Sequence, residues 1–411
     1  MKLGRMAWRN LWRRSRRTWI TAATIAFGVM LSVTFIAISD YSHSNMIVTS
    51  ATMGFGNLTL EPAGYNDTPT PDKRLRDAVA ARERILEWPG VKAAITRITG
   101  QAMLASATKS VGGTFIGIDP TQESPGHNIY LRALTEGSVF EGPGGSGAIV
   151  GAKMAENLNL RIGKKLVLTT TDIHDEIVSE IFRVTGIFRT GVSEVDGYVV
   201  LLPIDTVRAT LHYGPREATI VSIFIDDYRK AEPMREAISA AVGNPTQTVL
   251  TWNETQADMA GLVNLDRRMH FLLQFLVALL IAAGILNTIL MGVLERTREF
   301  GIMMAVGLSP AALFRLVLVE SFWIGLIGIL LGIVITTPWF LYMSRTGIDI
   351  RGLLHGYSAG GVVIEPVIKF RLYEESALAI LIEVLSLSLL AGLYPAFKAG
   401  RIPPVESLKK L

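Results

Sequence analysis

The chain has 411 residues, of which 49% are hydrophobic and 18% are charged. Because soluble domains carry about 25% charged residues, this composition excludes an ordinary soluble enzyme and favours a protein with both membrane and water-exposed parts. The absence of cysteine excludes disulfides, thiolate catalysis, iron–sulfur clusters and cysteine-ligated zinc. The net charge of +4 can be interpreted only once the basic residues are located.

The first 18 residues are strongly basic and contain no acidic residue. Trp8, Leu11 and Trp12 interleave with the basic side chains just before an apolar stretch. This pattern favours an amphipathic helix over 1–18 that lies on anionic lipid headgroups, in preference to a nucleic-acid-binding face. The basic residues of the segment are Lys2, Arg5, Arg9, Arg13, Arg14, Arg16 and Arg17.

Four apolar stretches are long enough to cross about 30 Å of hydrocarbon as helices. We place spans at 19–39, 271–294, 316–344 and 376–397. Basic residues precede the first span and follow the second and fourth, whereas none follows the first span until Lys73. The positive-inside rule therefore predicts cytoplasmic termini, a cytoplasmic link at 295–315 and a cytoplasmic tail at 398–411. The first stretch is too long for the core of a cleaved signal peptide, so we expect a retained anchor.

The region between the first two spans, 40–270, is far too long for a connecting loop. We expect a large extracytoplasmic α/β domain there, carried on helical stalks at 41–53 and 254–269. The expected fold is therefore an α-helical four-span transmembrane bundle with this domain between spans 1 and 2. A smaller outer loop, 345–375, is rich in glycine, and we expect it to pack beside the stalks.

Hydrophobic periodicity and turn residues predict the elements of the outer domain. A helix over 72–88 ends at Pro89 and Gly90. The other expected helices are 152–160 and 203–211. The expected strands are 92–104, 114–118, 148–150, 166–171, 181–188, 198–202 and 220–225.

No pattern of a catalytic, metal or cofactor site stands out. Gly142, Gly144 and Gly147 match G-x-G-x-x-G, but they lie in a Pro- and Gly-rich turn without a ribose-binding acidic residue after a following strand. The sequence contains no G-x-x-x-x-G-K-[ST], no H-E-x-x-H and no G-x-S-x-G. We therefore expect no enzyme activity, no metal and no bound cofactor on this chain.

A few residues inside the spans need an explanation. Glu383 is ionisable within a span, which indicates either a functional role or a protonated carboxyl that is hydrogen-bonded inside the bundle, for example to Ser386 or Ser388. Glu320 lies one turn inside the third span, within reach of Arg315 or the headgroups. In the same helix Gly325, Gly328 and Gly332 have the spacing of a close helix-packing seam.

The link between the second and third spans reads E-R-T-R-E-F-G-I-M-M-A-V-G-L at 295–308, a charged turn followed by apolar residues and glycine. Such a helix suits docking on a partner. It resembles the E-R-x-R-E-[FI]-G-x-x-x-A-x-G signature of the FtsX/MacB-like permeases of ABC transporters, the type VII or mechanotransmission class. The opening 7–13 and the ending 394–408, Y-P-A-F-K-A-G-R-I-P-P-V-E-S-L, are also similar to that family's.

The resemblance implies a dimer of permease subunits, identical or paralogous, with two ATPase subunits that bind ATP and Mg²⁺ on separate chains. ATP-driven closure would be passed through the stalks to the outer domain, with little or no substrate passing between the spans. The residues expected to couple to the ATPase are Glu295, Arg296, Arg298, Glu299, Phe300, Gly301, Met304 and Gly307.

The outer domain is similar to that of the lipoprotein-releasing permeases LolC and LolE. The similarity rests on G-I-D-P at 117–120, I-V-G-A-K-M-A at 149–155 and G-I-F-R-T-G at 186–191. It implies extraction of lipoproteins from the bacterial inner membrane toward the outer membrane, with a periplasmic chaperone as acceptor. Two alternatives remain, MacB-like efflux of a peptide, drug or toxin, and FtsX-like activation of a cell-wall hydrolase.

Overall fold

The structure, a computed structural model, describes residues 2–13, 15–242, 244–349 and 367–401. The chain divides into two compact units. One, here called the bundle, is built from described residues within 1–42, 265–350 and 367–411, and the other, here called the head, from those within 43–264. Most of the predicted outer loop at 345–375 and the end of the predicted tail lie outside the described residues.

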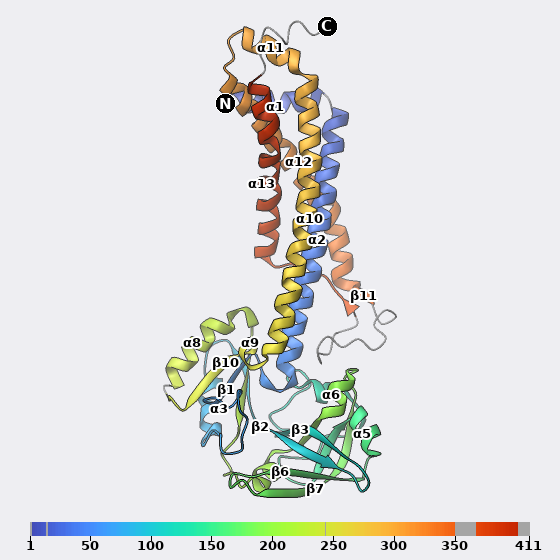
Figure 1. The fold of residues 1–411 in the computed structure, drawn as a ribbon, viewed down its shortest axis with the longest axis vertical. Helices are drawn as coiled ribbons and strands as arrows, with labels where there is room; N and C mark the ends of the chain where they lie inside the picture. Colours follow the sequence, from blue (N-terminus) through green and yellow to red (C-terminus); the bar gives the residue numbers. More distant parts are fainter. Residues whose placement is uncertain (1, 14, 243, 350–366, 402–411) are drawn as a thin grey trace. The chain divides into compact units, whose positions relative to one another are not determined.

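The bundle consists of long apolar helices with two short helices at one end (Figure 1). Four helical segments are long and apolar enough to cross a membrane, at Ser15–Phe55, Ala260–Glu295, Pro310–Thr346 and Glu374–Gly400. They contain all of the residues of the four predicted spans. The helices are α1 (Lys2–Arg13), α2 (Ser15–Ser50), α10 (Ala257–Glu295), α11 (Thr297–Ala305), α12 (Pro310–Thr346) and α13 (Glu374–Gly400).

Local sequence explains where these helices start and bend. Ser309 accepts a hydrogen bond from the Ala312 amide and Pro310 occupies the first helical position, which together begin α12. Pro338 and Pro395 lie inside α12 and α13, as proline does in membrane helices where neighbouring groups satisfy the freed carbonyls. Beyond α12, β11 (Ile348–Asp349) pairs with β12 (Val367–Ile368).

The head is built on one ten-stranded sheet whose longest strand, β2, has two sets of neighbours. Residues 91–97 of β2 pair with β9, in the series β10–β1–β9–β2, whereas residues 98–105 pair with β3. From there β3, β8, β5, β7 and β6 return to β2, so these six strands close a ring. The strands are β1 (Leu58–Pro62), β2 (Val91–Ala105), β3 (Ser110–Ile118), β4 (Leu134–Gly137), β5 (Gly147–Gly151), β6 (Lys165–Thr171), β7 (Ile177–Phe188), β8 (Val199–Pro203), β9 (Ile220–Ile225) and β10 (Gln247–Thr251).

Short helices cover the sheet and complete its core. Central strands are buried throughout, as β8 and β9 are, because both faces carry apolar neighbours. The large core includes Leu58, Phe115, Phe182 and Val221. The helical elements are η1 (Ala51–Phe55), α3 (Ala78–Leu86), α4 (Ile129–Arg132), α5 (Ala152–Leu158), α6 (Ser193–Tyr198), α7 (Ile204–Thr210), η2 (Tyr228–Lys230), α8 (Ala231–Val242) and α9 (Trp252–Thr255).

The predicted fold class, a four-span bundle with an α/β domain between spans 1 and 2, is confirmed. The predicted helix over 72–88 was too long, because Asp77 caps the Ala80 amide at 3.1 Å and fixes the helix start at Ala78. Strands β1, β4 and β10 and helix α8 were missed. Three of these are strands of only four or five residues, and Glu61 and Pro62 in β1 hide its strand pattern.

Candidate coupling site

Helix α11 is a nine-residue helix between two spans. It follows α10 after a single intervening residue, Arg296, whose backbone leaves the helical region at φ −106° and ψ 13°. At its far end Gly307 has a φ of +104°, which side chains disfavour, and its amide donates to the Met304 carbonyl at 3.0 Å. These two breaks make α11 a separate helix that changes direction at both ends.

Arg296 connects α11 to two other helices of the bundle. Its Nη1 donates to both carboxylate oxygens of Glu320 on α12 at 3.2 Å, and its Nε donates to Glu299 at 3.2 Å. Asn10 on α1 donates to the same Glu320 at 2.8 Å. The guanidinium also lies over the ring of Phe300, 5.1 Å from its centroid. We call this set of contacts the Arg296 junction, and through Glu320 it joins α1, α11 and α12.

Arg315 is not the partner of Glu320 in the structure, contrary to one of the two sequence-based expectations. The two residues are five positions apart on α12 and therefore point about 140° apart around the helix. Arg296 approaches from the α11 side at 3.2 Å instead. A further ion pair, Arg17 to Glu295 at 3.1 Å, connects α2 to the end of α10.

The residues predicted to couple to an ATPase divide by exposure. Phe300 is 1% exposed, and Gly301 is buried beside it, so both face the bundle interior and support α11 from behind. Arg298 and Gly307 are exposed. Of the remaining four, Glu295 is exposed, and Arg296, Glu299 and Met304 are half-buried.

Sequence analysis missed the apolar part of the outward face of α11. Ile302 is 47% exposed and Val306 is 84% exposed, and both follow Arg298 at steps of four residues. We call Arg298, Ile302 and Val306 the α11 face. Residues four apart lie on one side of a helix, so this spacing was the available signal. The residues were chosen by their match to the family signature instead.

A cavity of about 250 Å³ borders the Arg296 junction. Residues of α1, α2, α10, α11 and α12 line it, and its charged members are Arg13, Arg17, Arg296, Glu299 and Glu320. The side chains of Arg296 and Glu320 remain 12% and 14% exposed. The ion pair is therefore only partly shielded, and alternative partners lie in the same cavity.

The predicted packing glycines of α12 face two different helices. A Cβ at Gly328 would lie 2.5 Å from the Ile25 Cβ, and one at Gly332 would lie 2.8 Å from the Val29 Cβ, so both positions touch α2. Gly325 faces α13 instead, where a Cβ would lie 2.8 Å from the Ser388 Cβ. Close approach of this kind is how helices associate where lipid supplies no hydrophobic driving force.

A reciprocal contact joins α12 and α13, and sequence analysis missed half of it. Gly325 on α12 faces Ser388 on α13, and one turn away Gly392 on α13 faces Ser321 on α12. Both hydroxyls donate to their own helix, Ser321 to the Val317 carbonyl at 3.0 Å and Ser388 to the Val384 carbonyl at 2.8 Å. With their polar groups satisfied internally, the two serines act as small packing residues.

Glu383 on α13 has a partner on another helix. Gln274 on α10 donates to Glu383 Oε2 at 2.8 Å and to the Ser32 hydroxyl on α2 at 3.1 Å. Of the two serines suggested as partners, Ser388 donates to the Val384 carbonyl of its own helix, and Gln274 supplies a hydrogen bond to Glu383 instead. This polar group connects α2, α10 and α13, and a role for it beyond packing stays a prediction.

Two regions of the chain match known families. Residues 18–241 match the MacB-like periplasmic core domain, and residues 271–404 match the FtsX-like permease C-terminal region. The first match alone covers more than half of the chain. The protein therefore belongs to the family of ABC transporter permeases that combine a MacB-like periplasmic core domain with an FtsX-like C-terminal region.

Several curated relatives align with most of this chain. The chain is 25% identical to the lipoprotein-releasing system transmembrane protein LolC of Neisseria meningitidis, over 97% of this chain and 95% of that protein. It is 24% identical to LolE of Haemophilus influenzae, over 79% of each. It is also 24% identical to the pyoverdine export ATP-binding/permease protein PvdT of Pseudomonas putida, over 98% of this chain but only 58% of that longer protein.

Proposed function

We propose that this chain is the transmembrane subunit of an ABC transporter that uses ATP hydrolysis by a separate ATPase to extract lipoproteins from the inner membrane toward the outer membrane. The α11 face is the observation that carries the coupling part of this proposal. Exposed apolar residues beside an arginine, on a short helix braced from behind, are what a helix needs to dock in a groove of a partner. ATP and Mg²⁺ would then bind to the partner and not to this chain.

The lipoprotein part of the proposal rests on the relatives. LolC and LolE, both named for lipoprotein release, align with most of this chain and over most of their own lengths. The similarity to PvdT favours a second candidate function, export of a small molecule or peptide from the periplasm. The alignment, however, covers little more than half of the length of PvdT. A second permease subunit, identical or paralogous, and a periplasmic acceptor chaperone complete the proposed assembly.

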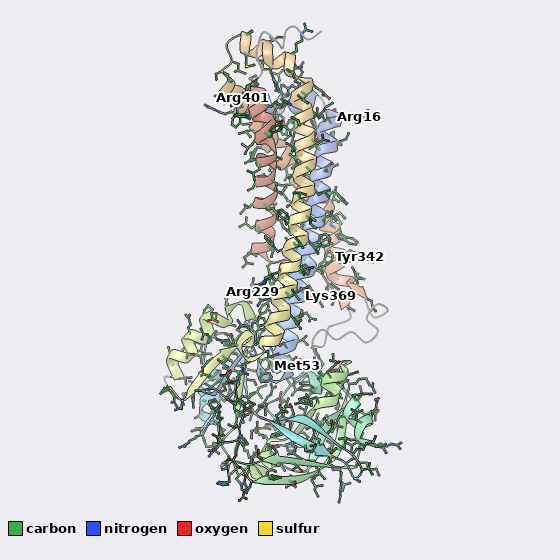
Figure 2. The ribbon with its side chains drawn as sticks, in the orientation of Figure 1. Arg16, Met53, Arg229, Tyr342, Lys369 and Arg401 are labelled. Carbon is green, nitrogen blue, oxygen red and sulfur yellow. The ribbon has the colours of Figure 1, made fainter. Side chains whose placement is uncertain are left out.

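We place the chain in the bacterial inner membrane with the α11 end of the bundle in the cytoplasm and the head in the periplasm. Arg16 and Arg401 lie at the α11 end (Figure 2), together with the arginine-rich α1. At the same end Trp8 packs against Trp12 and Trp323 at centroid distances of 5.7 and 5.1 Å. Tryptophan gathers at membrane–water interfaces, and arginine on the cytoplasmic side.

Reconstitution tests the proposal directly. The chain is co-expressed with its proposed ATPase partner, and the purified complex is placed in liposomes with a triacylated lipoprotein. ATP-dependent transfer of the lipoprotein to a soluble acceptor chaperone is expected, and it should stop when the ATPase carries an inactivating substitution. A complex that hydrolyses ATP without releasing lipoprotein would reject this substrate and favour export or activation of a cell-wall hydrolase.

A further inference from the structure

Arg97 occupies the point where strand β2 changes neighbours. It is the last β2 residue paired with β9, opposite Ile220, and the next residue, Ile98, already pairs with Gly117 of β3. Its side chain is fully buried, although an arginine is rarely found without solvent contact. The strand that pairs with β2 therefore changes directly after Arg97.

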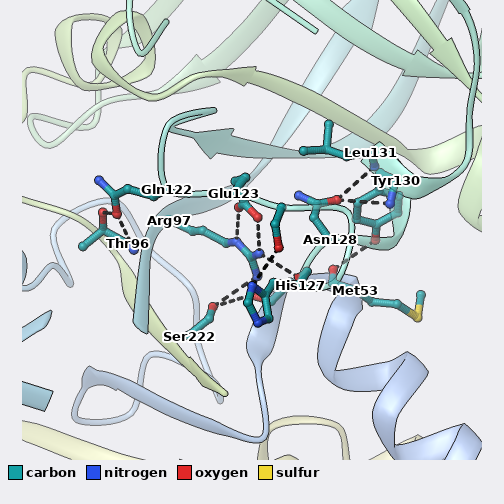
Figure 3. Close-up of polar contacts among 12 residues, drawn as sticks. Met53, Thr96, Arg97, Gln122, Glu123, His127, Asn128, Tyr130, Leu131 and Ser222 are labelled. Carbon is teal, nitrogen blue, oxygen red and sulfur yellow. Dashed lines mark hydrogen bonds and ion pairs between the residues drawn. The ribbon is translucent and has the colours of Figure 1, made fainter. Parts of the chain in front are cut away.

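The Arg97 guanidinium contacts three separate parts of the head (Figure 3). Nε and Nη2 donate to the two carboxylate oxygens of Glu123 at 2.7 and 2.8 Å, and Nη2 also donates to the His127 carbonyl at 3.2 Å. Nη1 donates to the Gly54 carbonyl at 2.7 Å and to the Ser222 hydroxyl on β9 at 3.4 Å. The loop after β3, the end of the first stalk and β9 are therefore held by one side chain.

The end of the stalk is shaped to offer its carbonyls to these donors. The helix α2 continues into η1, a π-helical turn, within which Gly54 has a φ of +138°. Only glycine adopts that conformation readily, and it turns the Gly54 carbonyl out of the helix toward Arg97 and the Ser222 hydroxyl, which donates to it at 2.5 Å. The neighbouring Met53 carbonyl accepts from the hydroxyl of Tyr130, which is 2% exposed.

Stability alone does not explain a buried ion pair here. Both side chains of the Arg97–Glu123 pair are 0% exposed, and desolvation offsets much of the attraction between two such charges. Well-packed apolar side chains of similar volume often stabilise a protein as much as a buried ion pair does, or more. An apolar pair, however, cannot bind the Gly54 carbonyl, and a two-pronged arginine–carboxylate contact fixes direction as well as distance.

We propose that the Arg97–Glu123 pair is the joint that fixes the end of the first stalk to both halves of the head, so that movement of the stalk turns the head as one body. Arg97 is in this sense a positioning residue for force transmission. The inference rests on the proposed function, since it assigns a route to the coupling that the ATPase would drive. It concerns contacts inside the head and does not depend on which substrate is carried.

The joint can be tested by distance measurements in the assembled complex. Because the chain has no cysteine, spin labels attach only at introduced sites, here Val48→Cys on the stalk and Ile177→Cys on β7, which are 47% and 78% exposed. The three backgrounds are wild type, Arg97→Met, and the double variant Arg97→Met with Glu123→Met. A matched control, Arg216→Met, breaks an exposed 2.8 Å ion pair to Asp77 in the same head.

We expect a narrow distance distribution in the wild type and the Arg216→Met control, and a broad one in both Arg97 variants. The double variant should recover thermal stability, because no unpaired charge remains, but not the narrow distribution. Lipoprotein released per ATP hydrolysed should fall about tenfold in both Arg97 variants while ATP hydrolysis itself continues. A double variant with wild-type distances and release would overturn the proposal, and so would a narrow distribution in Arg97→Met.

The two proposals fail differently. If the wild-type complex releases no lipoprotein, the proposed substrate is rejected, yet the label distances still report whether Arg97 fixes the stalk to the head. If release is normal in the wild type and in the double variant, lipoprotein extraction stands and the joint does not.

Discussion

Two arginine–glutamate contacts of similar chemistry differ in their surroundings. In the bundle, Arg296 and Glu320 lie 3.2 Å apart with 12% and 14% of their side chains exposed, and both have additional partners in Glu299 and Asn10. In the head, Arg97 and Glu123 lie 2.7 Å apart with no exposure on either side. Access to water, more than residue type, therefore decides whether such an arginine–glutamate pair can exchange partners or keeps one geometry.

The two ion pairs differ in the way that their roles in the proposed transporter require. An ion pair that keeps access to water contributes less net stability than its Coulomb attraction alone would give, because water and neighbouring charges compete for both partners. The Arg296 junction can therefore rearrange when a partner pushes on α11. A buried charge that loses its partner is strongly destabilising, so the Arg97 joint must keep one geometry throughout.

The largest loss of stability is expected when one partner of the buried Arg97–Glu123 pair is removed. Glu123→Ala leaves the Arg97 charge buried and unpaired, and we expect it to lower the free energy of unfolding by about 3–5 kcal/mol. Thermal unfolding of the purified chain in detergent measures the loss, with Arg216→Met as the exposed-pair control. A loss no larger than that of the control would show that the head readily hydrates its interior.

A third carboxylate, Glu61 on β1, extends the comparison to a buried acid whose hydrogen bond comes from a backbone amide, that of Asn66 at 2.9 Å. Burial raises the pKa of Glu61 from 4.5 to about 7, against the opposing effects of the Asn66 amide and Lys73. The folded state therefore holds the proton of the Glu61 carboxyl more tightly than the unfolded state does. The stabilisation of the fold by this bound proton is present at low pH and is lost as pH rises from about 4.5 to about 7.

We therefore expect Glu61→Gln to stabilise the chain by up to about 2 kcal/mol at about pH 8 and by little at about pH 5. Unfolding midpoints of variant and wild type at the two pH values test this. A stabilisation that is equal at both pH values would mean that Glu61 titrates normally in the folded head.

The close packing of α12 against α2 at Gly328 is a contact of the bundle that involves no charge. Gly328→Leu places a side chain where a Cβ would already lie 2.5 Å from Ile25, and we expect a loss of about 2 kcal/mol from overpacking. The matched control is Gly261→Leu, because nothing lies within 4 Å of a Cβ there. Retained thermal stability in the Gly328 variant would mean that α2 and α12 separate easily.

The partly shielded Arg296 junction should respond more weakly than the fully buried Arg97–Glu123 pair. Glu320→Gln keeps an acceptor for Asn10 and Arg296 but removes the charge, so we expect a stability loss of about 1 kcal/mol, close to the range of exposed pairs. Coupling should suffer more than stability, with ATP hydrolysis no longer raised by lipoprotein substrate. An unchanged response to substrate would exclude the Arg296 junction from coupling.

The smallest effect on stability is expected on the α11 face. Ile302→Asp and Val306→Asp alter exposed side chains and should leave the unfolding midpoint within about 0.5 kcal/mol of wild type. Binding of the ATPase should weaken about tenfold per substitution, as for moderate interface residues. Affinity measured between purified subunits tests this, and undiminished binding would place the ATPase contact elsewhere.

Hydropathy predicted the four spans of the bundle well, because a long uncharged run of apolar residues is compatible with few structures other than a membrane-spanning helix. The head was predicted only in part. Strand β10 pairs with β1, which lies nearly two hundred residues earlier in the chain, and no local pattern carries such a pairing. For the same reason Arg97 was invisible as a buried residue, since its partners Glu123 and Gly54 come from distant loops and turns.

At the α11 site the sequence located the helix but not its orientation. Phe300 was chosen as a contact residue and is buried, whereas Val306 was passed over and is 84% exposed. Glu320 was recognised, but its partner Arg296 is in another helix. Which side of a short helix faces inward depends on what packs behind it, and that information is tertiary.

The antiparallel pairing of β1 with β10 has a consequence for how such proteins diversify. Leu58 lies opposite Thr251, so the chain enters and leaves the sheet of the head at neighbouring positions. A domain with adjacent ends can be exchanged as a cassette without altering the segments on either side. A sheet domain transplanted from a relative at these two positions would leave the sequences of the membrane helices unchanged, so recombination could replace this domain without disturbing the bundle.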